Sequence, residues 1–127
     1  MANPISTAIK TGTVGELLVQ LRLLQYDVQA APPIKDSGND LVALRGFVVR
    51  TIQVKTTTDG VPGWPPEARL YHLLAIVRLE GEDTELSLDK SEVFLVPKHD
   101  LQGLAHTWEA LQPFALSAPH VSRLFAE

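Results

Sequence analysis

The sequence predicts a single α/β domain, and three observations support this fold class. The chain has 127 residues, which suffices for one compact domain and leaves no room for a second. Near the N-terminus, apolar residues recur with the period of a helix. Further along, residues 40–58 are dense in Val, Ile, Thr and Phe, as strands are. Apolar residues make up 45% and charged residues 20% of the chain, which is typical of globular domains.

The first element is a helix from Thr13 to about Gln25. Its apolar positions follow one another at steps of three, one, three and three residues: Val14, Leu17, Leu18, Leu21 and Leu24. This spacing predicts one apolar stripe on an amphipathic helix. Thr13 followed three residues later by Glu16 predicts a capping box at the start of the helix.

A β-hairpin is the central prediction of the sequence. A short strand at Val28–Ala31 and a turn-rich loop at Pro32–Asn39 precede it. The hairpin joins Asp40–Leu44 to Phe47–Thr56 through a turn at Arg45-Gly46.

The elements after the hairpin follow from their apolar runs, prolines and glycines. They are a loop at 59–68, a central apolar strand at Tyr71–Leu79, two short strands at Glu85–Leu88 and Glu92–Val96 around an acidic turn, and tail helices at about Asp100–Leu111 and Pro119–Ala126.

Composition excludes several function classes. The chain has no Cys, which excludes disulfides, thiolate zinc sites and a cysteine nucleophile. It has no apolar leader segment, and its longest apolar run, Leu73–Val77, is too short for a membrane span. We therefore expect a soluble cytoplasmic protein that is not inserted in a membrane.

Charge is divided unevenly along the chain. The net charge is −4, but residues 1–79 hold eight bases and six acids, whereas residues 80–127 hold three bases and nine acids. A nucleic-acid partner is therefore not excluded by the overall charge.

Counting along the hairpin groups polar side chains on one face. With Arg45-Gly46 as the turn, Asp40 faces Thr51, and Gln53 lies roughly 7 Å further along the strand. Asp40, Gln53 and Lys55 then share one face, and the other face carries Val48, Ile52 and Val54. Carboxylate and amide oxygens suit Mg²⁺, and an adjacent ammonium suits a phosphate, so the pattern indicates phosphodiester hydrolysis.

These residues resemble the PD-(D/E)xK nuclease superfamily, which has the restriction-endonuclease-like fold. Asp40, twelve intervening residues and then Gln53-Val54-Lys55 are similar to its catalytic signature. Gly15-Glu16 resembles the additional acidic position of its Holliday-junction resolvases and intron-encoded homing endonucleases. The resemblance covers residues 12–58. Asn39 stands where the family name has Pro, and Gln53 stands at the third acidic position.

The resemblance implies a Mg²⁺-dependent DNA endonuclease in which Mn²⁺ can replace Mg²⁺. Asp40 and Glu16 would be metal ligands, Gln53 would coordinate or orient the metal, and Lys55 would position the attacking water or stabilise charge on the phosphate. Val54 would offer its main-chain carbonyl to the metal. Small members of this superfamily pair two sites, so the resemblance also implies a homodimer or a higher homo-oligomer.

Each of these residues also has a purely structural interpretation. Glu16 could serve only the capping box, Asp40 could open a strand, and Gln53 and Lys55 could face solvent. Their joint order and spacing favour the nuclease-like site. The four histidines show no ligand spacing, so a histidine metal site is not expected. Trp64 and Trp108 are more simply explained by packing than by base stacking.

Two other functions remain open. One is a catalytically inactive module of the same fold that binds nucleic acid or assembles with protein, which Gln53 and the acidic second part of the chain favour. The other is a small interaction protein, such as an antitoxin-like or phage-encoded inhibitor.

Overall fold

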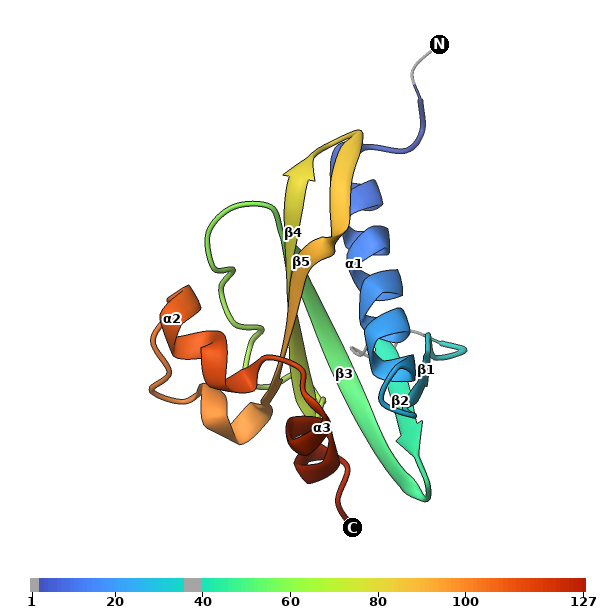
Figure 1. Ribbon diagram of the computed structural model, residues 1–127, viewed down its shortest axis with the longest axis vertical. Helices are drawn as coiled ribbons and strands as arrows, with labels where there is room; N and C mark the ends of the chain where they lie inside the picture. Colours follow the sequence, from blue (N-terminus) through green and yellow to red (C-terminus); the bar gives the residue numbers. More distant parts are fainter. Residues whose placement is uncertain (1–2, 36–39) are drawn as a thin grey trace.

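A five-stranded mixed sheet organises the chain (Figure 1). The computed structural model describes residues 3–35 and 40–127. In sheet order the strands are β1 (Gln29–Ala31), β2 (Leu41–Arg45), β3 (Val48–Thr57), β4 (Leu73–Glu82) and β5 (Glu85–Pro97). Strands β3 and β4 are parallel, and the other neighbours are antiparallel. The predicted α/β class is confirmed, as are the short first strand and the central position of the apolar strand. Of the predicted loop at Pro32–Asn39, residues 36–39 lie outside the described residues.

Helices lie on both faces of this sheet. The long helix α1 (Thr7–Leu24) runs alongside the sheet on one face (Figure 1). After β5 come the 3₁₀ helix η1 (Lys98–Leu101), the short helix α2 (Trp108–Leu111), the 3₁₀ helix η2 (Gln112–Phe114) and α3 (Ala118–Leu124). The predicted tail helix at 100–111 is therefore mostly wrong, since only its last turn is α-helical, whereas the last predicted helix is present.

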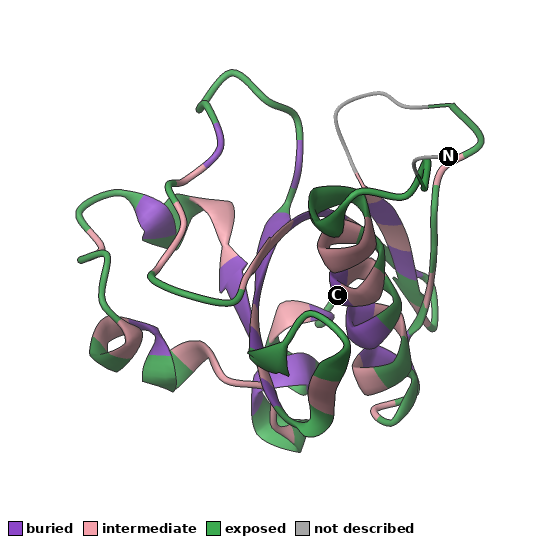
Figure 2. Cartoon of the chain, turned by 90° about the horizontal axis from the view of Figure 1, so that it is seen from above, coloured by how far each residue is buried: buried purple, intermediate pink, exposed green. Residues whose placement is uncertain are grey.

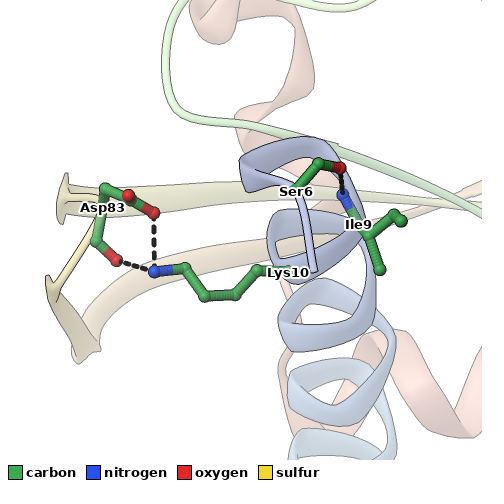
Figure 3. Close-up of polar contacts among 4 residues, drawn as sticks. All are labelled: Ser6, Ile9, Lys10 and Asp83. Carbon is green, nitrogen blue, oxygen red and sulfur yellow. Dashed lines mark hydrogen bonds and ion pairs between the residues drawn. The ribbon is translucent and has the colours of Figure 1, made fainter. Parts of the chain in front are cut away.

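Helix α1 begins six residues before the predicted start. Ser6 caps it, and the Ser6 hydroxyl accepts the main-chain N–H of Ile9 at 3.2 Å (Figure 3). Lys10, in the first turns, donates to the carboxylate and to the main-chain carbonyl of Asp83, both at 2.6 Å, and so ties the helix to the β4–β5 turn (Figure 3). The predicted capping box is wrong, because Thr13 lies inside the helix. Glu16 is therefore a mid-helix residue that caps nothing.

Only part of the predicted apolar stripe of α1 faces the core: Leu18 is buried there and Val14 packs against it, whereas the other three members do not. The helix buries Gly15, Leu18, Val19 and Leu23 against the sheet. Leu17, Leu21 and Leu24 instead point away from it and are 52%, 58% and 59% exposed. Because leucines occupy both sides of α1, the spacing of apolar residues alone could not identify the buried side.

The β2–β3 turn lies one residue later than predicted. Leu44 pairs with Val49 and Arg45 pairs with Val48, so the two turn residues are Gly46 and Phe47. Gly46 has φ of 62°, which a two-residue hairpin turn with Gly at its first position requires. Because the turn lies one residue later, the β3 partner of each β2 residue lies two positions further along β3 than predicted. Because side chains alternate, the predicted faces of β3 are preserved, but Asp40 comes to lie beside Gln53 instead of Thr51.

Strand β5 replaces the two short strands that the sequence predicts. Its 13 residues run without a break, and a shift in the β4–β5 register occurs between Arg78 and Glu80. Ser91 supports this irregular region, since its hydroxyl accepts the N–H of Glu80 and donates to the carbonyl of Ser87. The polar residues of the predicted turn are thus part of an edge strand.

Two apolar clusters cover the two faces of the sheet (Figure 2). On the α1 face, Val48, Ile52 and Val54 of β3 are buried as predicted. On the other face, Phe94 is buried among residues of β4, η1 and α2. Trp108 packs there against Phe94, with ring centroids 5.8 Å apart, and Trp64 stacks on His106 at 3.9 Å. The packing interpretation of both tryptophans is confirmed.

Within the described parts of the chain, no helix has both the length and the apolar character needed to cross a bilayer.

Candidate active site

Asp40 lies immediately before β2 and is held against β3. Its main-chain N–H donates to the carbonyl of Ile52 at 3.0 Å. Its carboxylate Oδ2 accepts two bonds of 2.8 Å, from the Gln53 side-chain Nε2 and from the main-chain N–H of Val54. Among the described residues, the other oxygen, Oδ1, accepts no hydrogen bond. The carboxylate is therefore fixed in place through Oδ2, and Oδ1 has no hydrogen-bond donor among residues 3–35 and 40–127, so it can face a cation.

Gln53 is buried beneath Arg69 and beside Asp40. The side chain is only 5% exposed, and its Oε1 accepts from Arg69 Nη1 at 3.4 Å. Arginine only donates hydrogen bonds, so the amide oxygen faces Arg69 and the amide nitrogen faces Asp40. In this arrangement Gln53 orients Asp40. Coordination of a metal by its oxygen would require the amide to turn.

A close approach of α1 to β3 brings Glu16 to the same site. Gly15 is buried against Thr56, and a Cβ atom at this position would overlap the Thr56 side chain. Glu16, the next residue, is half-buried. Burial raises the pKa of Glu16, and the negative charge of Asp40 raises it further. The two carboxylates are therefore close enough to repel each other.

One cavity of about 510 Å³ joins these groups. Helix α1, the start of β2 and strand β3 all contribute to its lining. Glu16, Asp40, Gln53, Val54 and Lys55 all line it, together with Ala8, Thr11, Gly12 and Thr56 to Thr58. All five candidate residues therefore line one cavity, although Glu16 comes from α1 and the Gln53 and Lys55 side chains come from the face of β3 opposite α1.

The donor set of this cavity fits a magnesium ion that keeps several of its water ligands. Glu16 and Asp40 supply two carboxylates, and the main chain of Val54 can supply a carbonyl. Mg²⁺ is commonly held by one or two carboxylates with water in its remaining positions. In residues 3–35 and 40–127 there is no cluster of three or more His, Cys, Asp or Glu side chains that could hold a metal.

The sequence analysis missed two features. Arg69 comes from the loop between β3 and β4, and nothing in its local sequence indicates a contact with Gln53. Three of the four histidines, His72, His99 and His120, line a second cavity of about 540 Å³ with Arg50 and Arg123. Sequence spacing gave no signal for this grouping because it forms only where the start of β4, the end of β5 and α3 meet.

Comparisons of the chain with protein-family models, with curated proteins and with solved structures found no match. The resemblance to the PD-(D/E)xK superfamily therefore depends on the residues of this chain and on their arrangement.

Proposed function

We propose that the protein is a Mg²⁺-dependent endonuclease that hydrolyses DNA phosphodiester bonds, with a PD-(D/E)xK site on a restriction-endonuclease-like fold. One observation carries the proposal: Glu16, Asp40, Gln53 and Lys55, from three separate segments, line a single cavity. A chance set of surface polar residues has no reason to converge in this way. The order of α1, the β2–β3 hairpin and β4 also agrees with the order that the resemblance implies.

Each residue has a chemical role in this proposal. Glu16, Asp40 and the Val54 carbonyl would hold Mg²⁺, which supplies a Lewis acid that polarises the phosphate and acidifies water. Gln53 keeps the Asp40 carboxylate in one orientation. The Lys55 ammonium places a positive charge beside the phosphate, where negative charge increases during attack by water. The threonines that line the cavity add hydroxyl groups that can bind phosphate oxygens.

The proposal includes DNA as the partner, a cytoplasmic location and a homodimer or higher homo-oligomer. A homodimer would present two copies of this site, one for each strand of a duplex. The exposed leucines on α1, Leu17, Leu21 and Leu24, support this part of the proposal because they offer an apolar contact surface.

The alternative function is a catalytically inactive module of the same fold. The observation that favours it is the Gln53 amide, which donates to Asp40 where an acid would supply a third negative charge. The variant Gln53→Glu addresses this alternative. If the natural protein binds DNA without cutting it and Gln53→Glu gains cleavage, the site is an inactive descendant of a nuclease site.

Cleavage of supercoiled plasmid DNA in Mg²⁺ or Mn²⁺ tests the proposal. We expect the natural protein to nick or linearise the plasmid, and Asp40→Asn and Lys55→Ala each to lower the rate by about 10²-fold or more. The matched controls are Asp89→Asn and Lys90→Ala, which remove the same charges from exposed positions on β5. Equal cleavage by all five proteins would indicate a contaminating nuclease and contradict the proposal.

A further inference from the structure

Three hydrogen-bond donors follow one face of the sheet, starting at the candidate active site. Lys55 projects from β3 itself, Arg69 contacts Gln53, and His72 contacts Thr51. Residues 51, 53 and 55 alternate along β3 and so share a face, at intervals of roughly 6.6 Å. We call Lys55, Arg69 and His72 the donor row.

Arg69 is held in place from several sides. Its main-chain N–H donates to the carbonyl of Pro66 at 3.0 Å, and its own carbonyl accepts from the Lys98 ammonium. Its side chain is exposed although one guanidinium nitrogen donates to Gln53. A guanidinium carries five N–H donors, so most of its donors remain for a ligand. Glu67, the acid in the same loop, lines a different cavity with Tyr71.

The ring of His72 is also fixed, because its Nδ1 is hydrogen-bonded to β3. Its Nδ1 accepts the main-chain N–H of Thr51 at 2.9 Å, and the main-chain N–H of His72 donates to the Thr51 carbonyl at 3.0 Å. Because Nδ1 is an acceptor, the neutral ring carries its proton on Nε2. The residue is exposed, so this Nε2–H donor can reach a ligand.

Each member of the donor row is, or contacts, one of three alternate β3 residues: Lys55 itself, Gln53 or Thr51. The interval between these three β3 positions is comparable with the separation of adjacent phosphates along one strand of DNA. We propose that one DNA strand lies along β3, with its reacting phosphate at the cavity beside Lys55 and the following phosphates bound by Arg69 and then His72. This inference rests on the proposed function and adds to it the path of the substrate.

Binding of a fluorescently labelled DNA duplex, measured by anisotropy over a series of KCl concentrations with Ca²⁺ in place of Mg²⁺, tests this path. We expect Arg69→Ala to reduce the slope of log affinity against log salt by about 0.9, because one fewer counterion is released. Arg69→Lys should keep the slope of the natural protein. His72→Ala should weaken binding several-fold with little change in the slope, since the contact proposed for this ring is a single Nε2–H hydrogen bond.

The control is Lys90→Ala, which removes an exposed positive charge on β5, away from the donor row, and should leave the slope unchanged. Slopes and affinities of Arg69→Ala and His72→Ala equal to those of the natural protein would overturn the strand path, whether or not the protein cuts DNA. A changed slope in Arg69→Ala without any cleavage by the natural protein would support the path and overturn the nuclease. Absence of DNA binding by the natural protein would overturn both.

Discussion

Two carboxylates meet at the candidate active site, and their surroundings differ. Asp40 accepts two hydrogen bonds from β3, which hold its carboxylate in one orientation. Glu16 projects from α1 beside it, and both burial and the Asp40 charge raise the pKa of Glu16. Glu16 is therefore protonated more readily than an exposed glutamate.

Removal of the Glu16 charge should stabilise the protein at neutral pH. The folded state raises the pKa of Glu16 above its ordinary value of 4.5, so the charged form is less favourable in the folded chain than in the unfolded chain. This destabilisation is absent below the pKa that Glu16 has in the unfolded chain. It develops as pH rises through the higher pKa that Glu16 has in the folded chain. We expect Glu16→Gln to raise Tm by roughly 1–3 °C at pH 7 and to leave it unchanged below pH 4. Thermal unfolding measured at both pH values, with the exposed Glu82→Gln as control, checks this; a lower Tm for Glu16→Gln at pH 7 would contradict it.

Metal binding should also depend on whether Glu16 is protonated. Here, in contrast to stability, the charged form of Glu16 is the favourable one. A carboxylate binds Mn²⁺ in its charged form, so protons compete with the metal, and a raised pKa moves this competition to higher pH. We expect Mn²⁺ affinity, measured by calorimetry, to fall as pH decreases through the raised pKa of Glu16. Glu16→Gln should bind more weakly and lose this part of the pH dependence. Asp40→Asn should abolish binding, and retention of full affinity in Asp40→Asn would locate the metal elsewhere.

At the scale of elements, the contact between α1 and β3 places Glu16 at the cavity. It depends on Gly15, where a side chain would overlap Thr56. We expect Gly15→Ala to destabilise the fold by about 1–3 kcal/mol and to lower Mn²⁺ affinity, because the helix must move away from the strand.

Gly12, one turn earlier in the same helix, is the matched control. A Cβ at Gly12 meets nothing within 4 Å, so Gly12→Ala should stabilise the protein by about 0.5–1 kcal/mol through helix propensity alone. Chemical denaturation measures both free energies. Partial recovery of Gly15→Ala by Thr56→Ala would confirm the contact, whereas equal effects of the two glycine substitutions would contradict it.

Local sequence patterns predicted the elements better than their ends or buried sides. The hairpin was predicted, but Arg45-Gly46 and Gly46-Phe47 are both possible two-residue turns, and only the need for positive φ at the first position favours the second. The start of α1 was missed because the Thr13–Glu16 pair imitates a capping box, whereas Ser6 has no Glu three residues later. Such ambiguities are resolved by packing against the rest of the chain.

The candidate site was predicted more fully than the helix that supplies part of it. The placement of Asp40, Gln53 and Lys55 on one face depends only on the alternation of side chains along a strand. This alternation is unaffected by the one-residue error in the position of the turn. Glu16 entered through the family resemblance, although the capping interpretation competed with it. Arg69 could not be predicted, because its contact with Gln53 joins a loop to a strand across the sheet surface.

At the scale of the whole molecule, an apolar surface on the outer side of α1 remains uncovered by the described residues. Leu17, Leu21 and Leu24 form a ridge on α1. Beside the ridge is a hollow of about 430 Å³, which Leu18, Leu21 and Leu88 help to line. A twofold interface uses the same surface on both copies, so it requires a projection and a recess side by side on one face. The outer face of α1 meets this requirement.

We therefore expect a dimer that Leu17→Glu combined with Leu21→Glu converts to a monomer. Both side chains are more than half exposed, so the double variant should fold with nearly the same secondary structure in circular dichroism. Sedimentation velocity should show the change in mass. Phe47→Glu is the matched control, because it removes an apolar side chain that is 95% exposed at the β2–β3 turn, away from the ridge. If paired sites cut both strands, the double variant should nick plasmid DNA but no longer linearise it. A natural protein that sediments as a monomer at every concentration, or a Phe47→Glu protein that dissociates equally, would contradict this interface without affecting the single site at Asp40.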